Sequence, residues 1–204
     1  MLSLWKISKA VEEDLAKKAI AGEHGALETL YDRYAPALLS VCFRYTGNRD
    51  DAEDVLHDGF IKIIRKIGTF RIRQDGSLEA WMRRIIVNTA LNFLRSRVRG
   101  RIFTDLDPIP DLAVTGDEEA ENPDDIYRSI SREKILELIC DLPEGYRTVF
   151  NLHVFEAYGH REISELLGCA ESTSKSQLFK ARALLRKKMN QLVNKKASPI
   201  YEKI

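Results

Sequence analysis

The chain has 204 residues, of which 44% are apolar and 31% are charged. This length suits one ordinary domain or two small ones, and this apolar content supports a folded core, which excludes a long disordered protein. No apolar run approaches the roughly 20 residues that cross a bilayer, and the first residues lack the order of a signal peptide. We therefore expect a cytoplasmic protein with no membrane insertion.

The net charge of +1 is divided unevenly along the chain. Residues 1–101 carry 18 basic and 13 acidic residues, and residues 126–204 carry 14 basic and 9 acidic residues. Residues 102–125 carry nine acidic residues, no basic residue and three of the six prolines. Such a stretch is typical of a linker. We therefore expect two basic modules joined by an acidic flexible linker.

The first module has the three- and four-residue spacing of apolar residues that predicts helices. We expect a short helix over residues 9–21 and longer helices over residues 27–45 and 52–67. Pro36 can bend or interrupt the second helix. The GlyAsn pair at 47 and 48 should end that helix, and no alternating strand pattern occurs. The apolar faces comprise Leu27, Leu30, Tyr31, Tyr34, Leu38, Val41, Cys42 and Tyr45, and then Ala52, Val55, Leu56, Phe60, Ile63, Ile64 and Ile67.

A third long helix should begin near Ser77 and run to about Arg99. At 100° per residue, Asn88, Arg95 and Arg99 lie within about 60° of Arg84, opposite a broad apolar arc. Residues 83–101 hold six arginines and no acid, so this stretch should attract phosphate. Trp81 could stack on a base, but a tryptophan beside apolar neighbours in a first turn favours the core.

The second module is expected to hold shorter helices. Residues 126–140 are amphipathic, and Pro143 can sit in the first turn of a helix that closes at residues 158–159. A short helix, a brief turn at residues 169–170 and a long helix over about residues 172–192 follow. This order is the layout of a helix-turn-helix.

The last helix should have one apolar face and one basic face. A solvated charged face is the ordinary interpretation of such a helix, but it does not explain an outward-facing Phe179. An aromatic ring among lysines and arginines suits contact with sugars or a thymine methyl, so we favour DNA binding. The basic face comprises Lys175, Ser176, Phe179, Lys180, Arg182, Arg186 and Lys187.

Other candidate sites are weaker. His153 and Glu156 could share a face with His160, but Gly159 should break the helix between them, which disfavours a metal site. Residues 48–54 are acidic but lack the spacing of a calcium loop. No motif suggests catalysis, so we expect neither an enzyme nor a metal or other cofactor. The cysteines, interpreted as reduced core residues, are Cys42, Cys140 and Cys169.

Six stretches together resemble a known family. LYDRYAPAL at 30–38, DDAEDVLHDGFIKI at 50–63 and WMRRIIVNTALNFLR at 81–95 resemble region 2 of a bacterial RNA polymerase sigma factor of the extracytoplasmic-function (ECF) group. The matching stretches for region 4 are LPEGYRTVFNL at 142–152, REISELLG at 161–168 and STSKSQLFKAR at 172–182.

The resemblance implies an all-α chain with four parts and no enzymatic activity. Residues 1–101 would be region 2, residues 102–125 the acidic linker, residues 126–196 region 4 with its helix-turn-helix, and residues 197–204 a tail. Such a protein is a dissociable subunit that directs promoter recognition and DNA opening. Its implied partners are the clamp helices of the largest subunit of core polymerase, promoter DNA and an anti-sigma factor.

The resemblance also implies roles for individual residues. The helix over 49–67 would dock on core polymerase, and the next long helix would capture a base flipped from the −10 element, which joins sequence recognition to strand opening. The expected core-binding residues, all placed on an exposed side, are Asp51, Asp54, Asp58, Lys62 and Arg65. The expected −10 residues are Arg84, Asn88, Asn92, Arg95 and Arg99. The expected −35 residues are Lys175, Ser176, Phe179 and Lys180, with His160 and Arg161 near the DNA backbone.

Five positions in the second module depart from the family pattern. Ser174 stands where valine is common, and Lys175 and Lys180 stand where arginine is frequent. Lysine lacks the bidentate fork that recognises guanine. Because residues 169–170 replace an aliphatic residue and a serine, the cap of the last helix could fall to Ser172 or Thr173.

Two other functions compete with a sigma factor. A stand-alone helix-turn-helix regulator would bind duplex DNA without polymerase, but it has no need of a docking helix or an arginine stripe in the first module. An interaction protein without promoter activity would only compete for core polymerase or an anti-sigma factor. The intact basic face over 175–187 argues against this last interpretation.

Overall fold

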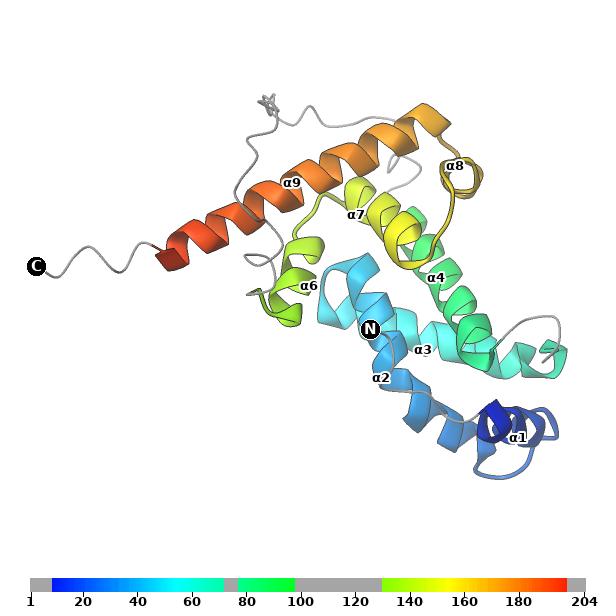
Figure 1. The fold of residues 1–204 in the computed structure, drawn as a ribbon. Helices are drawn as coiled ribbons and strands as arrows, with labels where there is room; N and C mark the ends of the chain where they lie inside the picture. Colours follow the sequence, from blue (N-terminus) through cyan, green and yellow to red (C-terminus); the bar gives the residue numbers. More distant parts are fainter. Residues whose placement is uncertain (1–8, 72–76, 98–129, 198–204) are drawn as a thin grey trace, which may run out of the picture. The chain divides into compact units, whose positions relative to one another are not determined.

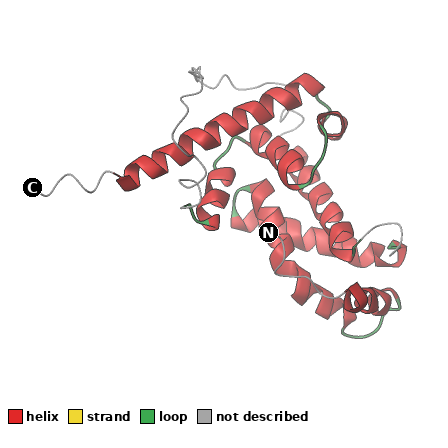
Figure 2. Cartoon of the chain, viewed as in Figure 1, coloured by secondary structure: helices red, strands yellow, loops and turns green. Residues whose placement is uncertain are grey.

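The computed structural model describes residues 9–71, 77–97 and 130–197, and these ranges contain helices and no strand (Figures 1 and 2). The prediction of an all-α chain with two helical regions is therefore confirmed. The chain divides into two compact units between Arg97 and Val98, here called the N-terminal and C-terminal units. The expected linker at 102–125 and the expected tail at 197–204, apart from the backbone of residue 197, lie outside the described residues.

The N-terminal unit is built on three helices that pack against one another: α2 (Ala26–Thr46), α3 (Arg49–Lys66) and α4 (Leu78–Arg97) (Figure 1). The shorter α1 (Lys9–Ile20) packs on α2 and on the single turn η1 (Ile67–Thr69). The core comprises residues from each of these three helices, and its largest fully buried side chains are Leu30, Leu38, Tyr45, Ile63, Leu78, Met82, Ile86 and Leu91.

Short-range signals set the ends of these helices. Gly47 ends α2 with a φ of 80°, a conformation that costs glycine little. The side chain of Asn48 then caps α3 by accepting a hydrogen bond from the backbone N–H of Asp51 at 2.9 Å. The hydroxyl of Ser77 accepts a bond from the N–H of Ala80 at 3.1 Å, as expected for the start of α4.

Pro36 does not interrupt α2, which continues through it. A proline inside a helix leaves the carbonyl of the residue four positions earlier without its usual donor. That residue is Asp32, and both Asp32 and Pro36 are exposed, so water can solvate the carbonyl. The helix therefore tolerates this proline.

The C-terminal unit contains α6 (Arg132–Cys140), α7 (Glu144–Phe150), the π turn η2 (Asn151–Phe155), α8 (His160–Leu167) and α9 (Glu171–Ala197). The helix-turn-helix is formed by α8 and α9, which contact each other (Figure 1). The long α9 also packs on α6 and α7. The core beneath α9 comprises Leu138, Ile139, Leu142, Tyr146, Ala181 and Leu185.

Several helix boundaries in this unit differ from the prediction. The helix expected from residue 126 begins at Arg132, because the side chain of Ser131 caps it at the N–H of Lys134; residues 126–129 lie outside the described part. Pro143 is the N-cap of α7 rather than part of its first turn. The helical path after α7 ends at Phe155, before residues 158–159.

The start of α9 is also corrected. Gly168 ends α8 with a φ of 67°, and α9 begins at Glu171. The N–H of Ser174 already bonds to the carbonyl of Ala170 at 3.2 Å, so Ser172 and Thr173 lie inside the first turn and neither is the cap. The helix continues to Ala197, beyond the expected end near residue 192.

Ala157 and Gly168 offer a matched pair of stability tests on either side of α8. Ala157 has a φ of 59° and Gly168 a φ of 67°, a region that disfavours residues with a Cβ. We expect Ala157→Gly to raise the free energy of unfolding by about 0.5 to 1 kcal/mol and Gly168→Ala to lower it by about 1 kcal/mol. Urea denaturation followed by circular dichroism measures both changes. A lower stability for Ala157→Gly would contradict backbone strain at this position.

Candidate nucleic-acid and polymerase interfaces

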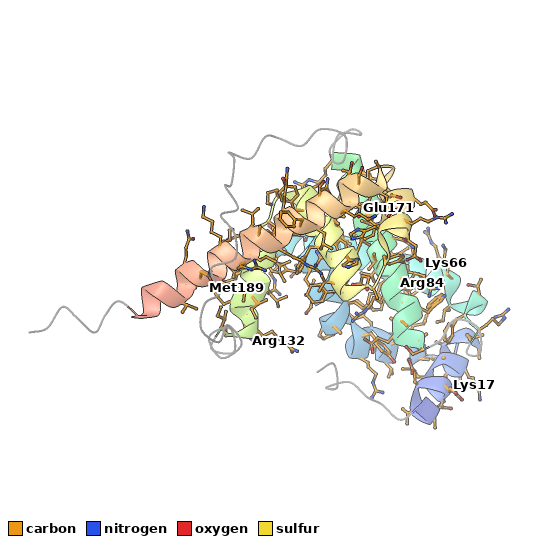
Figure 3. The ribbon with its side chains drawn as sticks, turned by 45° about the horizontal axis from the view of Figure 1, so that its top comes forward. Lys17, Lys66, Arg84, Arg132, Glu171 and Met189 are labelled. Atoms are coloured by element: carbon orange, nitrogen blue, oxygen red, sulfur yellow. The ribbon has the colours of Figure 1, made fainter. Side chains whose placement is uncertain are left out.

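The exposed side of α4 carries Arg84, Asn88, Asn92 and Arg95, here called the −10 stripe. Arg84 lies on this helix in Figure 3, and Arg95 donates to the side-chain oxygen of Asn92 at 2.8 Å. The opposite side of α4 is buried in the core of the unit. Four of the five expected −10 residues therefore share one accessible surface, and the fifth, Arg99, lies outside the described residues.

Trp81 belongs to the core, as expected. Its side chain is 8% exposed, and its ring contacts Phe70 with 5.4 Å between centroids. A buried indole next to the first turn of α4 stabilises the helix that carries the −10 stripe.

The expected core-binding residues of α3 divide into two groups. Asp54, Asp58 and Arg65 are exposed, as the sequence predicts. The prediction of exposure is wrong for Asp51 and Lys62, because both side chains turn toward α4. Asp51 forms an ion pair with Arg97, and Lys62 donates to the hydroxyl of Thr89 at 3.2 Å. These two contacts stabilise the packing of α3 on α4.

Two apolar residues that the sequence placed on buried faces are exposed. Tyr31 of α2 is 46% exposed and Ile64 of α3 is 45% exposed. The ring of Tyr31 covers Phe60 with 4.7 Å between centroids, and Ile64 lies one helical turn beyond Phe60. The exposed Ile64, which precedes exposed Arg65 on α3, extends the candidate protein-binding surface of this helix beyond its charged residues. Helical spacing alone does not distinguish them from core residues.

The exposed side of α9 carries Lys175, Ser176, Phe179 and Lys180, here called the recognition face. Phe179 is 60% exposed, the largest exposed fraction among the exposed large apolar side chains described. Lys175 pairs with Glu171 at 2.7 Å, and Figure 3 shows Glu171 at the start of the helix. The half-buried Ser176 donates to the carbonyl of Thr173 at 3.0 Å. Residues Ser174, Gln177, Leu178, Ala181 and Leu185 form the buried side of the same helix.

The two α8 residues expected near the DNA backbone differ in their surroundings. Arg161 is exposed and pairs with Glu165 at 3.3 Å. His160 is half-buried, and its Nδ1 lies 2.9 Å from the hydroxyl of Ser174. Burial, followed by the nearby His153 and Lys175, lowers the pKa of His160 below its ordinary value. These surroundings favour the neutral form of the ring.

The structure brings together two histidines that Gly159 was expected to separate. The rings of His153 and His160 stack with 4.8 Å between centroids and 10° between planes. The nitrogen lone pairs of two nearly parallel rings lie in two separate, nearly parallel planes, so they do not converge on one ion. Among the described residues, no group of three or more histidine, cysteine or acidic side chains could hold a metal ion.

The cysteines follow the core interpretation only in part. Cys42 is fully buried, and burial raises the pKa of its thiol to about 12. Cys140 and Cys169 are half-buried, and none of the three cysteines forms a disulfide. Within the ranges that the structure covers, no helix is long and apolar enough to cross a membrane.

Comparison with known proteins finds a matching family model for each of the two units. The model of sigma-70 region 2 matches residues 30–100, and the model of sigma-70 region 4 matches residues 132–185. The chain is 27% identical over 191 residues to the RNA polymerase sigma-H factor of Pseudomonas aeruginosa, covering 92% of this chain and 98% of that one. It is 29% identical over 188 residues to the ECF RNA polymerase sigma-E factor of Haemophilus influenzae, covering 89% and 97%. The solved structure of CnrH in complex with the cytosolic domain of CnrY has a TM-score of 0.47 and 20% identity, covering 88% and 97%.

These matches define a transcription initiation factor with sigma-70 regions 2 and 4. Within that class the chain belongs to the ECF group of RNA polymerase sigma factors. The match to region 2 disfavours the stand-alone regulator, which needs only a helix-turn-helix.

Proposed function

We propose that the chain binds core RNA polymerase in the cytoplasm and directs it to promoters with two DNA-binding surfaces, the −10 stripe and the recognition face. The observation that carries the proposal is the −10 stripe: exposed Arg84 and Asn88 within the region 2 match, on a helix whose other side is buried. A protein that only bound duplex DNA through its second unit would not need this surface. We also propose the domain limits 1–101, 102–125, 126–196 and 197–204.

At the −10 element, the stripe would act on a base taken out of the duplex. Extruding a base costs about a few kcal/mol, and hydrogen bonds and stacking in a protein pocket offset this cost. Arg84 and Asn88 are exposed and one helical turn apart, so both can reach the same nucleotide. Arg95 can then attract the neighbouring phosphate. Recognition and strand opening would be one event.

At the −35 element, the recognition face would enter the major groove, as in other helix-turn-helix proteins. Lys175 and Lys180 can contact phosphates or guanine edges, and the exposed ring of Phe179 can contact sugars or a thymine methyl. Arg161 is exposed at the start of α8 and can contact the DNA backbone.

Docking on core polymerase would use the exposed residues of α3. Asp54, Asp58 and Arg65 are accessible for the clamp helices of the largest subunit, and Ile64 adds apolar area. Asp51 and Lys62 would contribute indirectly, since they hold α3 against α4. An anti-sigma factor that covered the same residues would keep the protein from polymerase. The chain would act as an initiation factor and not as a catalyst.

Run-off transcription tests the proposal. The full chain is added to bacterial core polymerase and a template library, and the selected promoters are sequenced. A sigma factor gives transcripts that start downstream of a shared pair of elements. A stand-alone regulator binds DNA but gives no core-dependent transcript, and a protein that only competes for polymerase lowers transcription by other sigma factors.

Lys175→Ala and Lys180→Ala test the recognition face. Each should weaken binding at the −35 element by about 1 to 3 kcal/mol if the lysine contacts a base. If the lysine contacts phosphate, the slope of the logarithm of the binding constant against the logarithm of the salt concentration should decrease in magnitude by about one. Electrophoretic mobility shift at several salt concentrations measures both. Because both side chains are exposed, the circular dichroism spectrum should not change. Unchanged affinity and salt dependence in both variants would contradict the assignment.

A further inference from the structure

Side chains from two helical elements meet at the start of α9. His160, the first residue of α8, shares a hydrogen bond with the hydroxyl of Ser174, with 2.9 Å between its Nδ1 and Oγ. On its other side its ring stacks on His153 of η2. The Nδ1 of His153 lies 3.0 Å from the carbonyl oxygen of Tyr158. A carbonyl only accepts, so this nitrogen carries a hydrogen and donates it.

These contacts connect the π turn to the recognition helix. The Tyr158 carbonyl orients the ring of His153, which supports the ring of His160, which in turn bonds to Ser174. Ser174 is fully buried, so its hydroxyl needs a partner inside the protein. A hydroxyl at this position therefore ties one point of α9 to one orientation of α8.

The position of Ser174 on α9 makes that tie relevant to DNA binding. Lys175 and Ser176 follow it directly and lie on the recognition face. Successive residues of a helix are rotated by 100° and rise by 1.5 Å, so a small rotation or shift at Ser174 moves both neighbours by a similar amount. Hydrogen bonds to base edges tolerate little displacement.

The charges around His160 favour a neutral ring. Lys175 and Arg182 of α9 and His153 of η2 disfavour a positive charge on it, and Glu171 of α9 favours one. Burial is the largest cause of the lowered pKa of His160, and the charges of the first group add to it. The ring of His153 lies parallel to this ring, with 4.8 Å between centroids.

We propose that His160 and His153 are positioning residues that act through Ser174 to fix the recognition face of α9 for binding at the −35 element. This inference rests on the proposed −35 function of that face. It assigns to His160 a role through its Nδ1 and Ser174, in place of the direct contact with the DNA backbone that the family resemblance implies. It also gives a structural reason for a serine at position 174, where the family commonly has valine.

The test uses holoenzyme reconstituted from the full chain and core polymerase, with a promoter obtained by the selection above. Affinity is measured for that promoter and for the same promoter with a scrambled −35 element, at several salt concentrations. The variants are His160→Phe, which keeps a stacking ring and loses the bond, and His160→Asn, which keeps a hydrogen-bonding group near the Nδ1 position. Ser174→Ala removes the hydroxyl, and His160→Phe combined with Ser174→Ala removes both partners. His24→Asn, an exposed histidine of the N-terminal unit, is the control.

We expect His160→Phe and Ser174→Ala each to lower the preference for the intact −35 element by about fivefold to tenfold, as for one lost hydrogen bond. The double variant should lose no more than either single variant, because the two residues form one contact. His160→Asn should restore most of the preference, and the salt dependence should not change in any of these variants. Thermal unfolding of each variant verifies that the unit is folded.

Two results would overturn the positioning role. One is that His160→Asn and His160→Phe lose the preference for the intact −35 element equally and that the slope of the salt dependence of binding decreases by about one. This result indicates a direct phosphate contact. The other is that His160→Phe and Ser174→Ala keep the preference for the intact −35 element while Lys175→Ala loses it. That result contradicts the positioning role and agrees with the proposed −35 function of α9. If Lys175→Ala and Lys180→Ala also keep this preference, both the positioning role and the proposed −35 function of α9 are contradicted.

Discussion

Replacing Arg84 and Asn88 together with alanine is expected to reduce open-complex formation by about 100-fold, because loss of the base pocket removes a few kcal/mol that offset base extrusion. Binding to core polymerase should stay near the wild-type level, since the exposed Asp54 and Asp58 lie on another helix. Both replaced side chains are exposed, so the fold should not change.

Permanganate reactivity of unpaired thymines measures opening directly, and a pull-down with core polymerase measures docking. Lys17→Ala is the matched control, because Lys17 is an exposed basic residue of α1 in the same unit (Figure 3). If the double variant opened promoters as well as the wild type at saturating DNA, the −10 stripe would have no role in base capture. A loss in Lys17→Ala of similar size would indicate a general effect of charge.

The parts of the structure that the sequence predicted well depend on neighbouring residues. Gly47 and Asn48 mark a helix end and a helix start through local backbone preferences, and Ser77 does the same for α4. The exposure of Arg84 and Asn88 follows from the angular spacing of a single helix. These features need no knowledge of the partner helix.

The parts that the sequence did not predict depend on distant residues. Asp51 pairs with a residue 46 positions away, and Lys62 bonds to one 27 positions away. Tyr31 and Ile64 fit the apolar spacing of their helices, but the neighbouring helices leave them exposed. Periodicity predicts which residues share a face and does not predict how far the neighbouring helices cover it.

The stacked histidines show a different limit. The helix is broken between the two histidines, as expected, but the break is at Phe155, where the π turn η2 ends, and Gly159 is the N-cap of α8. Ala157, with a positive φ, lies in the connection, and the rings of His153 and His160 meet across it. Neither feature has a clear sequence signal, because a π turn is rare and alanine disfavours positive φ. A pair of histidines seven residues apart was therefore not predictable as a contact.

A buried arginine that sequence analysis did not single out connects two helices of the C-terminal unit. Arg147 of α7 is 8% exposed, and its guanidinium donates to the carbonyls of Cys140 at 2.5 Å and of Leu142 at 3.3 Å. The Cys140 carbonyl lies at the carboxyl end of α6, where a positive charge is also favoured by the helix dipole, and Leu142 lies between α6 and α7. Burial lowers the pKa of Arg147, but an arginine remains charged. The contact connects α6 to α7 beneath α9.

Arg147→Met is therefore expected to lower the free energy of unfolding of the C-terminal unit by about 2 to 4 kcal/mol, since methionine fills the space but leaves the carbonyls without this donor. Trp81 is buried in the core of the N-terminal unit, so the change in its fluorescence on unfolding follows that unit, whereas circular dichroism follows both units. In urea, the variant should shift part of the dichroism transition to lower concentration and leave the fluorescence transition in place. Arg132→Met, at an exposed arginine of α6, should shift neither. An unchanged dichroism transition in Arg147→Met would show that Arg147 does not stabilise the unit that carries the recognition face.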